Sequence, residues 1–220
     1  MTDPALPQGV ERREISGTRR LATRGDPVYG EPTDGEWRAW NPQRSKLGAM
    51  LASGMDTGLE GGETERVLYL GAASGTTVSH VADFAGPTYA VEFAPRPTRD
   101  LLSVVDSRPR LFPLLKDARK PETYAHVVEA DVDVIVQDVA TRGQARVALE
   151  NRRFLADDGR LLLAIKARSE DVTRDPDDVF ADVLADLEGG DESEGGYEVL
   201  ETQRLDEYHV DHLGVVARPR

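Results

Sequence analysis

From Arg66 onward, short apolar runs of strand length alternate with segments whose apolar residues recur at helical spacing. The runs predict strands, and the spaced segments predict helices. Strands that alternate with helices form a mostly parallel sheet with helices on both faces, because a helix is the usual crossover between parallel neighbours. The expected strands are 67–70, 88–91, 110–115, 132–136, 160–165, 198–204 and 215–218, and the expected helices are 77–84, 98–105, 144–154 and 177–187.

The last two expected strands, 198–204 and 215–218, have no helical segment between them. Their link of about ten residues is too short for a helical crossover, so we expect this pair to be antiparallel. The acidic, glycine-rich stretch Glu188–Gly196 that precedes them is typical of a solvated loop. The predicted fold class is therefore α/β, with a mostly parallel sheet and an antiparallel C-terminal strand.

The first fifty residues follow a different pattern, in which short β-type runs are interrupted by turn signals such as Ser16–Gly17 and Gly25–Pro27. We expect a small β-hairpin-rich module at residues 1–50, followed by a larger α/β domain at residues 51–220. A helix is expected from Ser45 to Gly58, where apolar residues recur at helical spacing.

The charge balance is unusual: 40 acidic against 27 basic side chains give a net charge of −13 at pH 7. Only four of the basic residues are lysines. An acidic, lysine-poor surface is typical of a protein that stays hydrated in concentrated salt, and we hypothesise a halophilic, cytoplasmic source. The chain has no cysteine, which excludes disulfides, a thiol nucleophile and Cys-ligated metals. No apolar run approaches the length of a membrane span and no secretory signal is visible, so no membrane partner is expected.

Side chains able to bind a ligand follow four successive expected strands. Gly71 and Gly75 bracket the first turn, Glu92 follows the second strand 21 residues after Gly71, Asp117 follows the third, and Asp138 follows the fourth. A carboxylate at this distance from a glycine turn can accept hydrogen bonds from ribose hydroxyls. Because ligands of open α/β sheets bind at the carboxyl ends of the strands, these residues predict a site for a nucleotide-like ligand.

Seven segments together carry a resemblance over nearly the whole chain: Trp40–Leu47, Tyr69–His80, Tyr89–Arg96, Asp117–Arg119, Asp138–Ala140, Ile165–Ser169 and Asp211–His212. In these segments the chain resembles the fibrillarin-like RNA ribose 2′-O-methyltransferases of archaea. It departs from the family pattern where Gln43, Thr141, Glu207 and Leu213 stand.

The resemblance implies a Rossmann-like class I methyltransferase fold and S-adenosylmethionine as the cofactor. The implied activity is methylation of ribose 2′-hydroxyls in pre-rRNA and tRNA. The implied partners are a box C/D guide RNA, a fibrillarin-binding scaffold protein and a kink-turn-binding protein. Together, the strand-end pattern and the resemblance place the cofactor contacts at Gly71, Gly75, Thr76, Thr77, Glu92, Phe93, Asp117, Ala118, Asp138, Val139, Ala140 and Thr141.

The resemblance also implies a catalytic set of Lys46, Asp138, Lys166 and His212. A ribose hydroxyl needs a positioned base, while a sulfonium methyl is already a good electrophile, so no metal is required. A lysine serves as base only where burial or a second cation favours its neutral amine. We hypothesise that Lys166 is the base, that Lys46 supplies the second cation and orients the substrate, that Asp138 holds the lysine, and that His212 or the nearby His209 positions or relays a proton.

Simpler interpretations remain open for the same residues. Lys166 could reach solvent at a strand end, Asp138 could cap a helix, and Trp37 and Trp40 suit packing between the two modules better than stacking on RNA. His80 and His126 are expected to be structural, and the arginines at 142, 146, 152 and 153 to form a solvated helix face. A small-molecule or protein methyltransferase, or a catalytically silent scaffold subunit, are the alternative functions. The net charge predicts poor autonomous binding to RNA.

Overall fold

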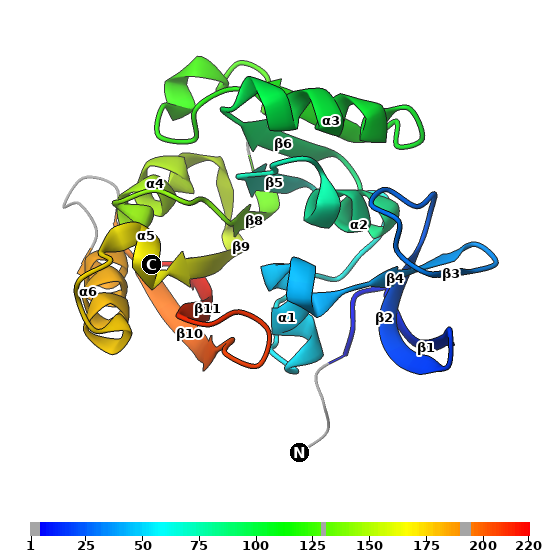
Figure 1. The fold of residues 1–220 in the computed structure, drawn as a ribbon. Coiled ribbons are helices and arrows are strands. Elements are labelled where there is room, and N and C mark those ends of the chain that lie inside the picture. The colour runs from blue at the N-terminus through cyan, green and yellow to red at the C-terminus, as the bar shows by residue number, and fades with distance from the viewer. Residues whose placement is uncertain (1–4, 129–130, 190–194) are drawn as a thin grey trace.

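The computed structural model describes residues 5–128, 131–189 and 195–220. Within these residues the strands form a four-stranded antiparallel sheet near the N-terminus and a seven-stranded sheet that follows it. The two sheets lie side by side, with α1 (Lys46–Ala52) and α2 (Thr76–Phe84) between them (Figure 1). The segment Glu188–Gly196, expected to be a loop, falls mostly outside the described residues.

The larger sheet has the strand order β10-β11-β9-β8-β5-β6-β7. Its parallel part consists of β5 (Val67–Leu70), β6 (Thr88–Glu92), β7 (Leu111–Leu115), β8 (Val132–Gln137) and β9 (Leu155–Lys166). The last two strands, β10 (Tyr197–Arg204) and β11 (His212–Pro219), are antiparallel, which confirms the predicted fold class. The chain moves outward from β5 through β6 to β7 and then returns to β8, so the switch point of the topology lies between β5 and β8.

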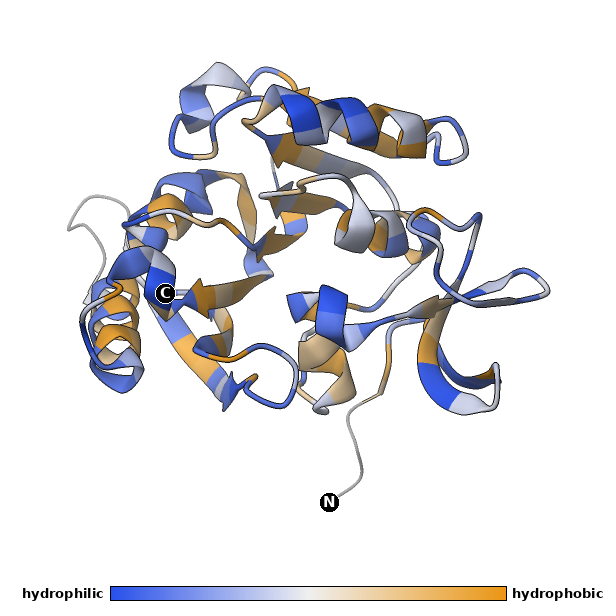
Figure 2. Ribbon diagram, viewed as in Figure 1, coloured by the Kyte–Doolittle hydropathy of each residue, from blue (hydrophilic) through white to orange (hydrophobic). Residues whose placement is uncertain are grey.

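Helices cover both faces of the larger sheet. Alternate residues of β5 point to opposite sides: Val67 and Tyr69 pack with α1, α2 and α3 (Pro95–Val105), whereas Leu68 and Leu70 pack with α4 (Gln144–Asn151) and α6 (Pro176–Gly189). A strand buried on both faces needs a continuous apolar run, which explains why strands such as β5 could be predicted from the sequence. Apolar residues concentrate on the strands and on the sheet-facing sides of the helices (Figure 2).

The N-terminal sheet consists of β1 (Glu11–Ile15), β2 (Thr18–Arg24), β4 (Trp37–Trp40) and β3 (Thr33–Asp34), in that order. It docks on α2 through Trp40, which is fully buried and stacks on His80 with ring centroids 4.8 Å apart. Packing between modules is therefore the role of Trp40, and His80 is structural, as predicted. His126, which was also expected to be structural, is instead exposed at the surface. The division at residue 50 stays a prediction, and α1 runs across that position.

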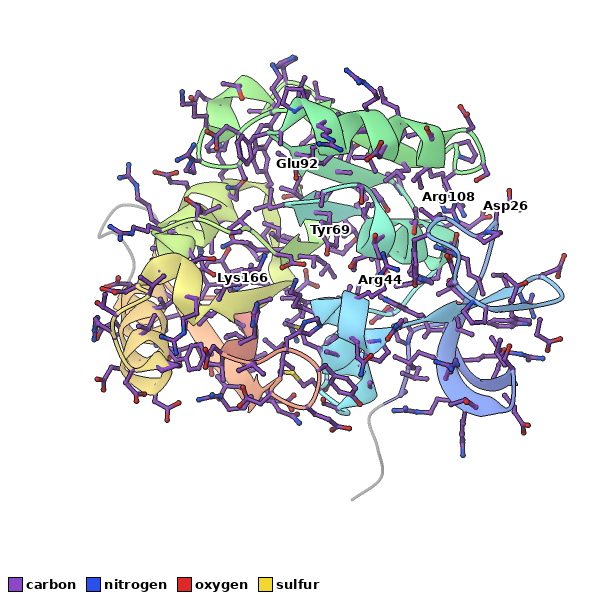
Figure 3. All side chains as sticks on the ribbon, viewed as in Figure 1. Asp26, Arg44, Tyr69, Glu92, Arg108 and Lys166 are labelled. Carbon is purple, nitrogen blue, oxygen red and sulfur yellow. The ribbon has the colours of Figure 1, made fainter. Side chains whose placement is uncertain are left out.

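Buried charges join the two sheets at the same place. The guanidinium of Arg38 on β4 contacts Glu31, and its Nε lies 2.7 Å from Asp83 Oδ2 on α2. Arg108 contacts the other oxygen of Asp83 at 3.0 Å and donates to the Asp26 carbonyl at 2.8 Å, at the edge of the N-terminal sheet (Figure 3). Burial raises the pKa of Asp83, whose carboxylate two arginines stabilise.

The predicted helix from Ser45 to Gly58 is shorter than expected. Ser45 caps α1 by accepting a hydrogen bond from Gly48 N–H, and the helix ends at Ala52. Gly54 follows with φ of 77°, and the N–H of Met55 bonds back to the Met50 carbonyl at 3.1 Å, a closing pattern that favours glycine. The sequence pattern missed this end because Met55 is buried just as a helical residue would be.

The sequence missed the 3₁₀ turns η1 (Pro42–Arg44) and η2 (Pro121–Thr123) and the short helix α5 (Ala167–Glu170). The helix expected over 144–154 is present as α4 followed by the 3₁₀ turn η3 (Arg152–Phe154). The helix expected over 177–187 is α6, where Asp175 accepts a hydrogen bond from Asp177 N–H and Pro176 is the first residue of the helix. In the part of the chain that the structure describes, no helix combines the length and apolar character that crossing a membrane requires.

Candidate active site

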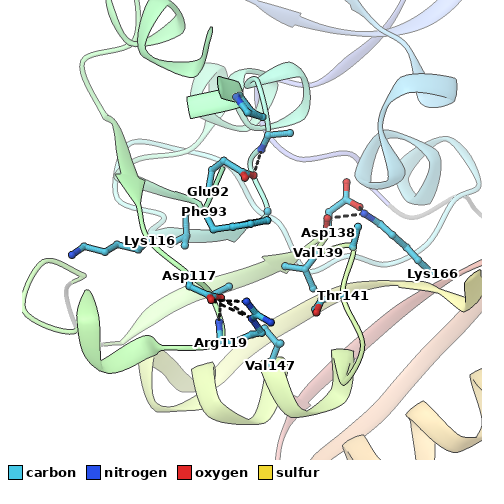
Figure 4. Close-up of a pocket in the computed structure, with 16 residues that line it drawn as sticks. Glu92, Phe93, Lys116, Asp117, Arg119, Asp138, Val139, Thr141, Val147 and Lys166 are labelled. Atoms are coloured by element: carbon cyan, nitrogen blue, oxygen red, sulfur yellow. Dashed lines mark hydrogen bonds and ion pairs between the residues drawn. The ribbon is translucent and has the colours of Figure 1, made fainter. Parts of the chain in front are cut away.

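A pocket of about 360 Å³ opens at the carboxyl ends of β5, β6, β7 and β8, on the switch point of the sheet (Figure 4). Ligand pockets of α/β folds occur at this place and are of this size. The lining residues are Gly71, Ala73, Val91, Glu92, Phe93, Pro97, Lys116, Asp117, Ala118, Arg119, Asp138, Val139, Ala140, Thr141, Val147 and Lys166.

Nine of the twelve predicted cofactor residues line this pocket, and three do not. Gly75 is the N-cap of α2 with φ of 93°, and a Cβ there would meet Leu101 and Val104 at 3.0 Å. Thr76 lies in a neighbouring pocket, and Thr77 is buried and hydrogen-bonded to Tyr69. These three residues shape the turn and the helix behind the pocket.

Glu92, at the end of β6, is held in one orientation. Its Oε2 accepts a hydrogen bond from Ala73 N–H at 2.9 Å, and its Oε1 accepts one from Ala94 N–H at 2.8 Å. The residue is 7 % exposed, and the pocket is the open side. Each carboxylate oxygen keeps a lone pair after these bonds, so Glu92 can still accept from a hydroxyl of a bound ligand.

The turn at Gly71 brings two backbone segments unusually close. Gly71 has φ of 86°, and a Cβ at this position would lie 2.8 Å from the Asp138 carbonyl oxygen. Only glycine fits both the left-handed conformation and the narrow gap. The β5–α2 turn and the segment after β8 therefore form a continuous floor for the pocket.

At the next strand end, Asp117 is paired within its own turn. Arg119 donates to both carboxylate oxygens, with Nε 3.0 Å from Oδ1 and Nη2 2.8 Å from Oδ2. The hydrogen bonds from Arg119 lower the pKa of Asp117. Sequence reasoning did not assign Arg119 to the site, although its place two residues after Asp117 is the signal that could have found it.

Three of the four predicted catalytic residues converge at one end of the pocket. The Lys166 ammonium lies 2.7 Å from Asp138 Oδ1 and donates to the Asp138 carbonyl at 2.8 Å (Figure 4). Lys46, at the first position of α1, has its Nζ 3.8 Å from the same Oδ1. Lys166 and Asp138 are largely buried, with side-chain exposures of 13 % and 14 %. One carboxylate thus stands between two ammonium groups.

The fourth residue, His212, opens β11 directly opposite Lys166 of β9. Its Nδ1 lies 2.7 Å from the Val210 carbonyl, and its ring centroid is 5.6 Å from that of His209. Burial lowers the pKa of both histidines, and the nearby Lys46 acts in the same direction. Both imidazoles are therefore neutral at neutral pH.

Gln144 is a residue that the sequence did not point to. Its buried amide accepts from Lys166 N–H at 2.9 Å and donates to the Lys166 carbonyl at 3.1 Å. This two-point contact fixes the backbone of Lys166 where β9 ends. No spacing rule connects residues 144 and 166, since the contact depends on how α4 packs against β9.

The fibrillarin family profile matches residues 10–220. A fibrillarin-like rRNA/tRNA 2′-O-methyltransferase of Halorubrum lacusprofundi is 71% identical over 220 residues, which is 100% of both chains. Among solved structures, a fibrillarin/Nop5p complex is similar, with a TM-score of 0.88, 39% identity, and 98% of this chain and 99% of that chain covered. The fibrillarin of Aeropyrum pernix, solved with natively bound S-adenosyl-L-methionine, has a TM-score of 0.79 and 45% identity over 95% of this chain and 94% of that chain. The chain therefore belongs to the fibrillarin family.

Proposed function

We propose that this chain methylates ribose 2′-hydroxyls of rRNA and tRNA with S-adenosylmethionine as methyl donor. One cavity carries this proposal, because Glu92 lines it at one end, and Asp138 and Lys166 line it at the other. A nucleoside held by Glu92 and a reacting group beside Lys166 would thus share one site. The name of the Halorubrum relative and the ligand of the Aeropyrum structure support this assignment.

The residues of the pocket suit this cofactor. Glu92 is fixed to accept from ribose hydroxyls, and the Gly71 turn lets the ligand approach the backbone closely. Phe93, which is 67 % exposed beside the pocket, offers a face for stacking on the adenine ring. When bound, the cofactor supplies an electrophilic methyl group on a positively charged sulfur.

Lys166 is the proposed base. Its neutral amine takes the proton of the 2′-hydroxyl as the oxygen–methyl bond forms and the sulfur–methyl bond breaks, with the bonding electron pair left on sulfur. Asp138 orients the Lys166 amine, and the Lys46 ammonium lies 3.8 Å from the same carboxylate. Lys166 then returns the proton to solvent.

His212 is proposed to position the ribose or relay the proton. It stands opposite Lys166 across the β9–β11 pair, and its imidazole is neutral because burial lowers its pKa. Because a carbonyl can only accept, His212 donates its Nδ1–H to Val210, and its Nε2 keeps a lone pair that can accept a hydrogen bond from the ribose hydroxyl or a proton from Lys166.

The choice of nucleotide is proposed to come from a box C/D guide RNA, with a scaffold protein and a kink-turn-binding protein as partners. A net charge of −13 disfavours autonomous attraction of RNA, so base pairing with a guide is a better source of specificity. The similarity to a fibrillarin/Nop5p complex supports a scaffold partner.

The test is transfer of labelled methyl from S-adenosylmethionine to a target RNA in molar salt, with and without guide RNA and partner proteins. Guide-dependent 2′-O-methylation is expected, and Lys166→Ala should abolish turnover while cofactor binding persists. Lys120→Ala is the matched control, because Lys120 lies outside the pocket. Cofactor binding without transfer to guided RNA would instead support a methyltransferase for another substrate, and near-normal turnover by Lys166→Ala would contradict the assignment of the base.

A further inference from the structure

The proposed catalytic set has one member that is not carried by the larger sheet. Asp138, Lys166 and His212 stand at the ends of β8, β9 and β11, which are hydrogen-bonded neighbours. Lys46 comes instead from the start of α1, next to the N-terminal sheet. Its distance from the other three depends on whatever ties that segment to the larger sheet.

At the end of α1 where Lys46 lies, a hydrogen bond from the loop between β10 and β11 adds to the packing of Leu47 in the core. His209 Nε2 is 2.7 Å from the carbonyl oxygen of Pro42, the residue that opens η1 just ahead of α1. A carbonyl can only accept, so His209 carries its proton on Nε2 and donates it to Pro42. The loop between β10 and β11 lies beside α1 (Figure 1).

The loop that carries His209 is itself well anchored. The backbone N–H groups of Tyr208 and His209 both donate to the Leu205 carbonyl, at 2.8 and 2.7 Å. Leu205 is fully buried, and its N–H donates to the His212 carbonyl at 3.0 Å. His209 therefore stands on a short rigid arm that also ends at His212.

The far end of the same segment is held by packing and by a hydrogen bond that Asp56 N–H donates to Glu201 of β10 at 2.9 Å. Met50 of α1 and Met55 beyond it press on Gly214 of β11, where a Cβ would meet their side chains at 3.0 to 3.1 Å. These contacts fix the C-terminal end of α1 but lie more than one helical turn from Lys46.

We propose that His209 is a positioning residue, which sets the distance of Lys46 from Asp138 and Lys166 by its hydrogen bond to Pro42. This inference rests on the proposed function. Lys46 has a long side chain that is 23 % exposed and 3.8 Å from Asp138, so it needs a fixed backbone to hold this geometry. A shift of about 1 Å in a positioned group lowers a rate by up to about a hundredfold.

The charge state of His209 also affects the position of Lys46 beside Asp138. The groups that face it are Lys46, Asp138 and His212. Burial lowers the pKa of His209, so the ring is neutral and adds no further cation beside the two lysines. Protonation at lower pH would place a third positive charge near Asp138 and push Lys46 away.

The test compares His209→Ala, His209→Gln and the surface variant His126→Ala in the assembled particle. A glutamine amide can place an N–H near the position of Nε2 and has no titration of its own. We expect His209→Ala to lower kcat about ten- to a hundredfold with unchanged affinity for S-adenosylmethionine, and His209→Gln to recover most of the loss. We also expect the acid limb of the pH profile to weaken in His209→Gln.

A second readout does not depend on activity. The chain has only four lysines, so trace acetylation followed by mass spectrometry reports each of them separately. His209→Ala should change the labelling rate of Lys46 and leave that of Lys120 as it is, and His209→Gln should restore the rate of Lys46. Unchanged labelling of Lys46 in His209→Ala, or a glutamine variant as poor as the alanine variant, would overturn the inference. An inactive wild-type particle would count against the proposed function alone, because the labelling still decides the role of His209.

Discussion

Lys166 and His212 are direct partners in the antiparallel pairing of β9 and β11. Opposed residues in such a pair have Cα atoms about 4.5 to 5.5 Å apart, so both side chains are held by the sheet itself. Gln144 adds two hydrogen bonds to the backbone of Lys166 on the side away from β11. The proposed base is therefore fixed by its backbone, and its chemistry depends on what surrounds its amine.

Replacement of Lys46 by methionine should separate chemistry from cofactor binding. Lys46 contacts Asp138 but does not line the pocket, so its loss should lower kcat by about 10² to 10⁴ with little change in the Kd of S-adenosylmethionine. Single-turnover methyl transfer and calorimetry measure the two effects. An equal loss of kcat and of affinity for S-adenosylmethionine would mean that Lys46 supports the fold of the pocket.

Glu92→Gln should weaken cofactor binding and leave the rate of methyl transfer nearly unchanged. The amide offers one acceptor in place of two, and its NH₂ group faces a backbone N–H of Ala73 or Ala94. Loss of a charged hydrogen bond of about 1.5 to 3 kcal/mol predicts cofactor affinity lower by about ten- to a hundredfold. Turnover at saturating cofactor should stay within a few-fold of wild type, and a kcat defect with normal affinity would argue against a ribose-binding role.

Arg38→Met should destabilise the whole protein. It leaves Glu31 and Asp83 buried without one of their charge partners, a change that typically reduces the free energy of unfolding by about 3 to 5 kcal/mol. Urea unfolding at constant high salt measures it. Arg146→Met is the matched control, because it removes a solvent-exposed pair with Glu150 worth at most about 1 kcal/mol. Similar effects of both variants would show that the buried charges at α2 carry no special weight.

His80 makes stability depend on pH. Burial lowers its pKa well below the ordinary value of 6.5, and the neutral ring contacts Thr23 and Tyr29. The unfolded chain takes up this proton first as pH falls, so the free energy of unfolding should decrease below about pH 6.5, by at most about 1.4 kcal/mol per pH unit. His80→Gln should remove this part of the slope between pH 7 and pH 5, and His126→Gln should leave it. Equal slopes in wild type and His80→Gln would refute the assignment.

Salt should stabilise the fold. The net charge of −13 makes the folded surface repel itself, and this repulsion is screened when the Debye length falls to about 3 Å at 1 M salt. We expect Tm to rise steadily from low to multimolar sodium chloride. A Tm that falls with salt would contradict the halophilic interpretation.

The sequence predicted the parts of the fold that follow local rules. The central strands of the larger sheet, such as β5 and β6, are buried on both faces and stand out as apolar runs, and Gly71 and Glu92 lie where a strand-end pattern places them. The approach of Lys46 to Asp138, across 92 positions, was implied by family resemblance and not by spacing. The contact between His209 and Pro42, which are 167 positions apart, could not be predicted from any local sequence pattern.

The buried charges behind α2 were equally invisible from the sequence. Arg38, Asp83 and Arg108 look like ordinary surface residues of a highly charged chain, and only the docking of the N-terminal sheet buries them. The end of α1 was missed for a similar reason, because a buried methionine after a tight turn has the same pattern as one inside a helix.

Lys46 reaches the site from α1, outside the larger sheet. Proteins open in cooperative units of differing stability, and we expect the N-terminal sheet and α1 to open more readily than the strands that carry Gly71 and Glu92. Transient opening of the N-terminal sheet and α1 would leave Glu92 and Gly71 in place while removing one of the two lysines from Asp138. The rate of hydrogen exchange in residues 5–52 would then report the fraction of molecules that can bind the cofactor but cannot transfer its methyl group.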